Sequence, residues 1–227
     1  MRIVVNAAMS ADGKLSTCER EQVDISAEAD FERVDRLRAE SDAVMVGVGT
    51  VIADDPSLTV TDPDRRRRRE DRDEPVNPAR VVADSRIRTP PNAQVLDGKA
   101  ESYLLVSEAA PTDFVAQMEE SGATVIVAGE SRVALPEALA ALESEGIDQL
   151  MVEGGGELIF SLFEDDLVDR LSVYVGPVVI GGREAPTLAD GEGFTGGFPE
   201  LDLASVERLD EGVVLEYDVA GLSGSGR

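Results

Sequence analysis

The stretch QLMVEGGGELIFSLFEDD, residues 149–166, decides the fold. Its first four residues predict a short buried strand, the glycines at 154–156 predict a turn, and the apolar spacing after them predicts a helix. Glycine lets the main chain approach a ligand closely, and a helix N-terminus offers free N–H groups with a partial positive charge. Because open α/β sheets bind ligands at the carboxyl ends of their strands, we predict an anion or diphosphate cradle here. The alternative is a tight turn that only packs the helix.

Glu153 lies between the predicted strand and the glycines. A carboxylate at this position can bind the amino or hydroxyl groups of a ligand held in the cradle. The segment is neither a GxGxxG fingerprint nor a GxxxxGK[ST] P-loop, so the prediction rests on the strand, glycine and helix pattern alone.

Short hydrophobic runs alternate with helical patterns along the rest of the chain. Strands are predicted at 1–8, 43–47, 79–83, 102–106, 124–128 and within 171–182, and helices at 27–40, 112–121 and 134–145. Ser26 is the predicted N-cap of the first helix. The segment SVERLDEGVVLEYDV, residues 205–219, predicts a closing hairpin. We therefore predict an α/β fold with a central mixed, mostly parallel sheet, helices on both of its faces and an antiparallel C-terminal hairpin.

No composition shift divides the chain convincingly, so we predict one domain over residues 1–220. A polar stretch, TDPDRRRRREDRDEPVNP at 61–78, is expected to be an insertion that forms a solvated loop. Its five arginines at 65–69 face neighbouring acids, which argues against the alternative of a nucleic-acid-binding arm. The glycine- and serine-rich end, 221–227, is expected to be a flexible tail.

The charge balance excludes several classes of function. Lysine plus arginine total 21 against 46 acidic residues, which gives a net charge of −25 with no histidine. Such a field repels nucleic acid, and a triad that needs a histidine base has no candidate. The single cysteine, Cys18, allows neither an internal disulfide nor a thiolate zinc site, and we expect no metal. We hypothesise that the protein works in concentrated salt; an ordinary acidic protein is the alternative.

No apolar run approaches the roughly 20 residues that a membrane span needs. The start, MRIVVNAAMS, lacks the layout of a signal peptide. We therefore expect a cytoplasmic protein.

The segment GVGTVIADDPSLT, residues 47–59, again leaves a predicted strand through glycines. Thr50 could cap a short helix or contact a phosphate, and Asp54 could accept a hydrogen bond from a ribose or an amide. Asp55-Pro56 is expected to end that helix. Turn and cap chemistry alone is the alternative.

Two further segments follow predicted strands. In SADGK, residues 10–14, Lys14 is one of only two lysines, and its ammonium could pair with a substrate phosphate or hydroxyl. A plain Asp-Gly turn is the alternative there. In DSRIRTP, residues 84–90, Ser85 and Arg86 could bind the 2′-phosphate of NADP, with a solvated loop as the alternative.

Taken together and in this order, these segments resemble the pyrimidine reductases of riboflavin biosynthesis. That family comprises the reductase domain of the bifunctional riboflavin deaminase/reductase and the stand-alone archaeal and fungal reductases. The matching pieces are MSADGKLS, LRAESDAVMVGVGTVIADDPSLTV, NPARVVADSRIRTP and VEGGGELIFSLFEDDLVDRLSVYVGPVVIGG, within about residues 3–188. The resemblance implies a dihydrofolate-reductase-like fold, usually as a homodimer. It also implies NADPH-dependent reduction of a ribosylamino-pyrimidine 5′-phosphate to the ribitylamino product.

The resemblance implies roles for individual residues. The implied substrate-binding residues are Lys14, Arg38, Leu58 and Glu153. The implied cofactor-binding residues are Ala8, Thr50, Asp54, Ser85, Gly155, Gly156, Glu157, Leu158, Ile159, Phe160 and Ser161. NADPH is the expected cofactor, with NADH as the alternative.

The chain departs from the family pattern at two positions. Thr61 stands where the family often has a basic residue that helps hold the substrate, and Arg65 or another arginine could replace that residue. Asp24 stands where bacterial members have a tryptophan. The deaminase half is absent, because its H-x-E and P-C-x-x-C zinc site needs a histidine and further cysteines.

The resemblance therefore points to the stand-alone kind, whose substrate is 2,5-diamino-6-(ribosylamino)pyrimidin-4(3H)-one 5′-phosphate. Hydride would pass from the nicotinamide to C1 of the ribose moiety. Lys14 and Glu153 are the candidate catalytic residues, since they would hold the ribose hydroxyls and the base edge, and Arg38 would hold the 5′-phosphate. Asp12 could handle a proton if its pKa were raised. The alternatives are a pterin or dihydrofolate reductase and a non-catalytic nucleotide-binding module.

Overall fold

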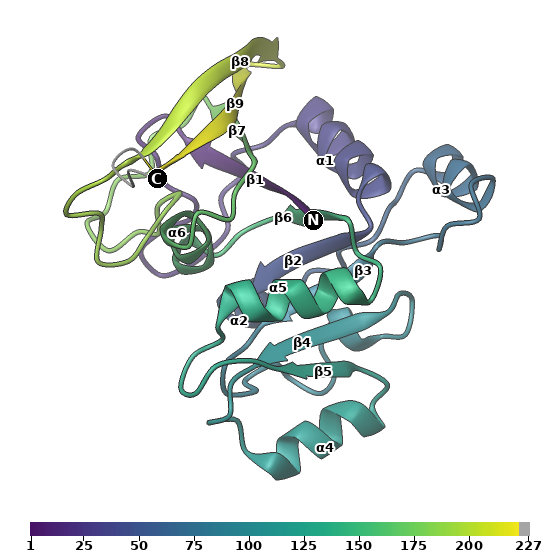
Figure 1. Cartoon of the computed structure of the whole chain (residues 1–227). Helices are drawn as coiled ribbons and strands as arrows, with labels where there is room; N and C mark the ends of the chain where they lie inside the picture. The colour runs from purple at the N-terminus through teal and green to yellow at the C-terminus, as the bar shows by residue number, and fades with distance from the viewer. Residues whose placement is uncertain (223–227) are drawn as a thin grey trace. The chain divides into compact units, whose positions relative to one another are not determined.

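Figure 1 shows the computed structural model of the chain, which describes residues 1–222. The chain divides into two compact units within the predicted single domain. The mid-chain unit comprises Asp35–Met151 together with Met1, and the terminal unit comprises Arg2–Val34 and the chain from Val152 onward. Of the predicted tail 221–227, residues 221 and 222 end the last strand and the rest lies outside the described residues.

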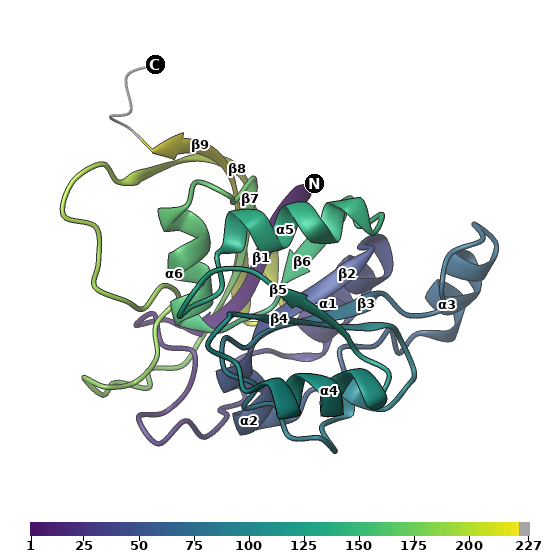
Figure 2. The ribbon, with the colours of Figure 1, turned by 60° about the horizontal axis from the view of Figure 1, so that its bottom comes forward.

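The mid-chain unit contains four parallel strands in the order β5-β4-β3-β2. They are β2 (Ala43–Gly47), β3 (Ala79–Ala83), β4 (Ser102–Val106) and β5 (Thr124–Val127). Its helices are α2 (Val48–Asp54), α3 (Pro63–Glu70), the short 3₁₀ helix η1 (Gln94–Leu96), α4 (Thr112–Glu120) and α5 (Leu135–Ser144). Figure 2 shows α5 on one side of these strands and α2 and α4 on the other. Covered on both faces, the central strands are continuous apolar runs such as AVMVG rather than alternating patterns.

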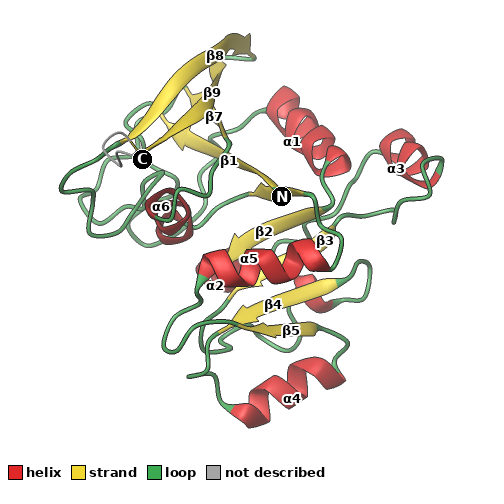
Figure 3. Cartoon of the chain, viewed as in Figure 1, coloured by secondary structure: helices red, strands yellow, loops and turns green. Residues whose placement is uncertain are grey.

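The terminal unit contains four strands in the order β1-β7-β9-β8. They are β1 (Arg2–Ser10), β7 (Arg170–Gly176), β8 (Pro199–Leu209) and β9 (Gly212–Leu222), with helix α6 (Gly156–Glu164) beside them. Strands β1 and β7 are parallel, whereas β9 is antiparallel to both β7 and β8. The predicted C-terminal hairpin is therefore confirmed. The long connection between β7 and β8 is drawn as loop in Figure 3.

Two elements begin in one unit and end in the other, namely α1 (Glu28–Glu40) and β6 (Gln149–Val152). Within the terminal unit, buried Arg33 fastens the first turns of α1 to the strands. Its guanidinium donates to the Asn6 side chain of β1 and to the Ser172 hydroxyl of β7, both at 2.8 Å, and pairs with Asp30 at 2.9 Å. A buried guanidinium needs such partners, because an unpaired buried charge is strongly destabilising.

The solvated loop expected at 61–78 is wrong, because residues 63–70 form helix α3. Asp62 caps this helix by accepting from the amides of Asp64 and Arg65, both at 2.8 Å, and proline occupies its first turn. Arg69 is only 2% exposed and donates to the carbonyls of Ala39 (2.9 Å) and Ser41 (2.8 Å). The buried residue of α3 is thus an arginine that donates to main-chain oxygens. A hydrophobic pattern in the sequence could not indicate packing of this kind.

Two predicted helix caps are also wrong. The first helix begins at Glu28, and the Ser26 hydroxyl donates to the Asp30 carboxylate instead of accepting from an amide. Thr50 lies inside α2, whose N-cap is Gly47. The predicted end of α2 is confirmed, because Asp55 adopts the left-handed conformation with φ 40° and donates its amide to the Val51 carbonyl at 3.0 Å. No helix within residues 1–222 is long and apolar enough to cross a membrane.

Candidate active site

The triple-glycine turn before α6 has the geometry of a main-chain cradle. Gly154 has φ 148° and Gly155 has φ 95° and ψ 96°, which are conformations that favour glycine. Gly155 is the N-cap of α6 and offers no side-chain cap to the first amides of the helix. Gly155 is half-buried and Glu157 is exposed, so the turn is not sealed along its whole length. Uncapped amides at a helix N-terminus suit an anion.

Gly156 is required by a close approach of the chain. A Cβ on this residue would lie 2.6 Å from the Asp190 carboxylate and 2.6 Å from the Thr187 carbonyl oxygen. The Asp190 amide donates to the Gly156 carbonyl at 3.0 Å. Segment 187–190 therefore packs directly on the first turn of α6, which is a contact that the sequence analysis missed.

The side chains of α6 divide by burial. Leu158, Ile159 and Phe160 are each less than 9% exposed and belong to the core of the terminal unit. These three implied cofactor residues can therefore offer a ligand only their main chain. Glu157 is exposed and Ser161 is half-buried, so both side chains can reach solvent.

Lys14 lies at the end of the turn that follows β1, as predicted. The turn closes through a bond from the Gly13 amide to the Ser10 carbonyl at 2.9 Å. The Lys14 ammonium donates to the Ala185 carbonyl at 3.1 Å, and Lys14 forms an isolated β-bridge with Thr187. The structure thus connects Lys14 to the triple-glycine turn through residues 185–190, all within the terminal unit.

Asp12 does not meet the condition for handling a proton, because its pKa is lowered and not raised. The Ser10 hydroxyl (2.6 Å) and the amides of Ile180 (3.0 Å) and Gly181 (2.7 Å) lower its pKa to about 2. Hydrogen bonds to the charged form favour ionisation. Asp12 instead fixes the chain at 180–181 beside the turn that carries Lys14.

Ala8 and Glu153 both lie in the terminal unit, and Ala8 is within β1 and not at its end, because the strand continues to Ser10. Ala8 packs against a cluster of Ile25, Tyr174 and Val214. Burial raises the pKa of the Tyr174 hydroxyl, as does the charge of nearby Asp30. Glu153 follows β6 directly and is half-buried.

In the mid-chain unit, α2 carries Thr50 and Asp54. The two residues are one helical turn apart and therefore share a face of α2. Thr50 is half-buried and Asp54 is exposed. Both side chains are consistent with ligand contacts, although neither caps the helix.

Arg38 and Leu58 come together in the mid-chain unit. The Arg38 guanidinium donates to the Thr59 carbonyl at 3.2 Å. Leu58 has a φ of 52° and its side chain is 1% exposed, so it can offer a substrate only its main chain. Arg38 itself is half-buried beside this segment.

Arg65, the candidate replacement for a basic residue at position 61, is engaged in an ion pair. Its guanidinium lies 2.9 Å from the Asp35 carboxylate. Asp35 also accepts from the Thr61 amide (2.5 Å) and the Thr61 hydroxyl (2.8 Å). Burial opposes ionisation, but these hydrogen bonds hold the pKa of Asp35 below its usual value. Thr61, Asp35 and Arg65 together fix the segment after Thr59.

The segment after β3, residues 84–90, is a turn held by hydrogen bonds to a buried carboxylate. It is therefore not the solvated loop that was the alternative. Asp84 is fully buried and accepts from the amides of Arg88 (2.6 Å) and Thr89 (2.7 Å). The Ser85 hydroxyl accepts from the Val133 amide at 3.1 Å. Arg86 is exposed, so its guanidinium can meet a phosphate.

A hollow of about 360 Å³ lies elsewhere in the mid-chain unit, lined by residues such as Ser107, Val115 and Val127. None of the predicted site residues lines it, so it is not the candidate site. Within residues 1–222, no group of three or more His, Cys, Asp or Glu could hold a metal ion.

Comparison with known proteins places the chain in a family. Residues 1–215 match the family model described as the RibD C-terminal domain. The chain belongs to this family. A relative from Archaeoglobus fulgidus is 47% identical over 210 residues, which are 92% of this chain and 94% of the relative. Another relative, from Methanothermobacter thermautotrophicus, is 43% identical over 221 residues, which are 96% of this chain and 98% of that relative. Both are named 2,5-diamino-6-ribosylamino-4(3H)-pyrimidinone 5′-phosphate reductase.

Solved structures share the RibD reductase fold. A pyrimidine reductase-like protein from Corynebacterium diphtheriae gives a TM-score of 0.82 at 18% identity, covering 96% of this chain and 91% of that one. The Rib7 riboflavin biosynthesis reductase of Saccharomyces gives 0.69 at 18% identity, covering 96% and 90%. At these identities the likeness shows the fold alone, and it confirms the predicted α/β architecture.

RibD reductases form a family that uses a nicotinamide cofactor. The residues present fit such a group at the triple-glycine turn, because the N-cap Gly155 gives the first amides of α6 no side-chain cap. A diphosphate is the part of a dinucleotide that a helix N-terminus binds.

Proposed function

We infer that this chain reduces 2,5-diamino-6-ribosylamino-4(3H)-pyrimidinone 5′-phosphate to its ribitylamino product in riboflavin biosynthesis. The chain is an oxidoreductase, and its substrate is a phosphorylated pyrimidine. The observation that carries this conclusion is 47% identity over 92% of the chain to a reductase of that name. The uncapped N-terminus of α6 supports it, because a nicotinamide dinucleotide needs a diphosphate site.

NADPH is the cofactor that we propose. The main chain at 154–157, in the terminal unit, would hold its diphosphate. The exposed Arg86 guanidinium supports a preference for the 2′-phosphate, because arginine binds phosphate through charge-assisted hydrogen bonds. NADH remains the alternative.

The chain's own residues would bind and orient the substrate. Within the terminal unit, the Lys14 ammonium and the Glu153 carboxylate would hold the ribose hydroxyls and the base edge. The nicotinamide supplies the hydride when it is bound. Orientation of two reactants can contribute about 7–11 kcal/mol to lowering a barrier, so these residues need not include a strong general acid.

A substrate comparison tests the proposed function. NADPH oxidation is followed at 340 nm with the ribosylamino-pyrimidine phosphate and, separately, with dihydrofolate. We expect turnover with the pyrimidine only. Turnover with dihydrofolate alone would establish a pterin-type reductase, and NADPH binding with neither activity would establish a nucleotide-binding module.

We also propose that the protein is a homodimer and that the β8–β9 hairpin contributes to its interface. The register pairs Leu203 with Tyr217 and Val206 with Leu215, and an irregularity between Leu203 and Ser205 keeps Val206 on the same face as Leu203. This apolar face continues from buried Val173 of β7, which pairs with Leu215. On β8 the face is exposed, with Leu203 at 57% and Val206 at 59%. An exposed apolar row that extends a buried core marks an association surface, and a second copy is the occupant that the family resemblance implies.

Leu203→Glu is expected to convert the dimer to a monomer, because a carboxylate cannot be buried in an apolar interface without a partner. Light scattering coupled to size exclusion measures the mass directly. Asp202→Glu is the matched control, since it places a glutamate on the opposite face of the same strand. A monomeric wild type, or a dimer that persists in Leu203→Glu, would contradict the proposed interface.

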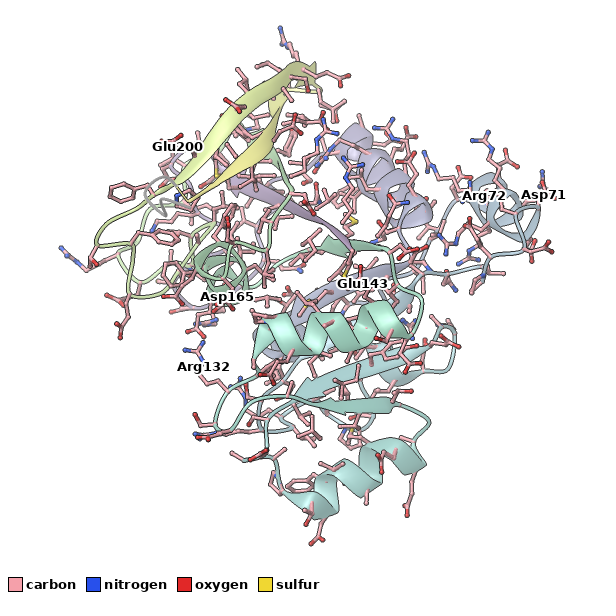
Figure 4. The ribbon with its side chains drawn as sticks, in the orientation of Figure 1. Asp71, Arg72, Arg132, Glu143, Asp165 and Glu200 are labelled. Carbon is pink, nitrogen blue, oxygen red and sulfur yellow. The ribbon has the colours of Figure 1, made fainter. Side chains whose placement is uncertain are left out.

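The acidic residues are spread over both units, which supports the salt hypothesis. Figure 4 labels Glu143 on α5, Asp165 directly after α6 and Glu200 on β8. With a net charge of −25, repulsion among such groups destabilises the folded state, and salt screens it over a Debye length of about 10 Å at 0.1 M.

We propose a KCl-rich cytoplasm as the working environment and expect the melting temperature to rise by at least ~5 °C between 0.1 and 2 M KCl. In a chain of this size about 1 kcal/mol corresponds to roughly 2–4 °C. Differential scanning calorimetry measures the shift. An unchanged melting temperature would remove the salt hypothesis and leave an ordinary acidic protein.

A further inference from the structure

Residues 185–190 form a clasp between the turn that carries Lys14 and the first turn of α6. On one side, the Leu15 amide donates to the Pro186 carbonyl at 2.9 Å, and the Lys14 ammonium donates to the Ala185 carbonyl at 3.1 Å. On the other side, the Asp190 amide donates to the Gly156 carbonyl at 3.0 Å. The same six residues therefore contact both the implied substrate lysine and the implied cofactor cradle.

One side-chain pair closes the clasp. Asp190 Oδ1 accepts from the Thr187 amide at 3.0 Å and from the Thr187 hydroxyl at 2.6 Å. The other oxygen of Asp190 lies against Gly156, where a Cβ would approach it to 2.6 Å. Both residues are half-buried. A hydrogen bond to a carboxylate is shorter and stronger than one between neutral groups, so this pair fixes the shape of the clasp.

The clasp is also anchored on the body of α6. Gly191 has φ 128°, and a Cβ there would lie 2.5 Å from the Phe160 ring. The Phe194 ring packs on the same Phe160, with centroids 4.9 Å apart. The chain after Asp190 is therefore held against the helix.

We propose that Thr187 and Asp190 are positioning residues that set the Lys14 ammonium relative to the cradle at the N-terminus of α6. The role of Lys14 in substrate binding rests on the proposed function, whereas the contacts between the clasp and Lys14 do not depend on it. A lysine side chain has four rotatable bonds, so its ammonium is mobile unless a partner holds it. The Ala185 carbonyl is that partner, and the clasp fixes the position of its oxygen. Small misplacements of a binding group cost large factors in rate.

Thr187→Val is the decisive variant, because valine keeps the shape of threonine but cannot donate to Asp190. We expect the KM for the pyrimidine substrate to rise about 10-fold or more, which is the usual scale for losing a hydrogen bond to a charged group. The Kd for NADPH, measured by its fluorescence, is expected to change less than KM, because Gly156 stays anchored by the Asp190 amide. Thr187→Ser keeps the hydroxyl and is expected to restore the wild-type KM.

Lysine reactivity gives a readout that needs neither turnover nor cofactor. The chain has two lysines, and Lys99 pairs with Asp97 at 2.7 Å in the mid-chain unit, far from this clasp in sequence. Competitive acetylation followed by mass spectrometry measures the ratio of Lys14 to Lys99 labelling. We expect this ratio to rise several-fold in Thr187→Val and to return to the wild-type value in Thr187→Ser.

Two further variants keep the test sharp. Ser205→Ala removes a hydroxyl bond to the Glu216 carboxylate (2.9 Å) in the same unit and serves as the matched control, with no change expected in KM or in the labelling ratio. Asp190→Asn retains an acceptor of lower strength, and we expect a smaller shift in the same direction, which covers the case in which Thr187→Val does not fold.

A labelling ratio and a KM that stay at wild-type values in Thr187→Val would overturn the positioning role. A wild-type enzyme without pyrimidine turnover would instead refute the proposed function. In that case the labelling ratio still decides whether the clasp holds Lys14.

Discussion

Glu153→Gln is expected to lose at least ~100-fold in kcat while keeping its affinity for NADPH within a factor of two. The carboxylate follows β6 directly and lies at the triple-glycine turn, where we place the ribose hydroxyls of the substrate. A charged acceptor binds a hydroxyl more strongly than an amide oxygen does, and 100-fold in rate corresponds to about 2.7 kcal/mol. The amide has nearly the same shape, so the strand and the turn are expected to remain intact.

Steady-state kinetics and a fluorescence titration with NADPH measure the two halves of this prediction. Glu164→Gln, at the exposed end of α6, is the matched control for the loss of one negative charge and is expected to behave as wild type. Near-normal turnover in Glu153→Gln would refute a substrate role for this residue. Loss of NADPH affinity together with turnover would move Glu153 to the cofactor site.

Gly156→Ala is expected to weaken NADPH binding by at least ~100-fold. The added methyl group would lie 2.6 Å from both the Asp190 carboxylate and the Thr187 carbonyl oxygen, and real Cβ contacts do not come that close. Part of this obstacle is main chain, so either the clasp or the first turn of α6 must shift. Because the amides of that turn are the implied diphosphate site, a shift there removes the donors from the ligand.

NADPH fluorescence and the melting temperature are measured on the same samples. Gly196→Ala is the control in the same unit, because nothing lies within 4 Å of a Cβ at that position. We expect this control to keep wild-type affinity. Tight NADPH binding by a folded Gly156→Ala variant would show that the diphosphate does not lie at this turn.

The elements that the sequence predicted well have continuous apolar patterns. The ranges 43–47, 79–83 and 102–106 are confirmed residue for residue as β2, β3 and β4. Each contains a core of buried aliphatic residues, such as Val81 and Val82 of β3, and strands covered on both faces are typically rich in such residues. The triple-glycine turn was predicted for a similar reason, since only glycine occupies φ values such as those of Gly154 and Gly155.

Helix α3 was missed because its packing is polar. The buried position is Arg69, which is held by three main-chain carbonyls instead of apolar side chains. Figure 4 labels Asp71 and Arg72, which directly follow this helix and are exposed, although Arg72 also donates to the Ala39 carbonyl at 3.3 Å. An arginine that ties two segments together and one that meets solvent look alike in the sequence.

The sequence also identified only some of the candidate site residues. Lys14 and Glu153 were singled out because charged groups at strand ends bind ligands in open α/β folds. Thr187 and Asp190 were not, because the residues that they contact at the site, Lys14 and Gly156, are distant from them in sequence. The lowered pKa of Asp12 has one local cause, the Ser10 hydroxyl, but the amides of Ile180 and Gly181 that also lower it are distant in sequence.

The sequence by itself determined the α/β class, most strand positions, the glycine turn and the residue types available for binding. Local preferences and hydrophobic periodicity govern these features, and both are properties of neighbouring residues. Only the tertiary structure decided that Arg65 forms an ion pair with Asp35 and that the side chains of Leu58 and Ile159 are buried. It also decided that residues 185–190 connect Lys14 to Gly156. Long-range hydrogen bonds and close approaches set these outcomes, because folding brings groups that are far apart in sequence into hydrogen-bonding distance.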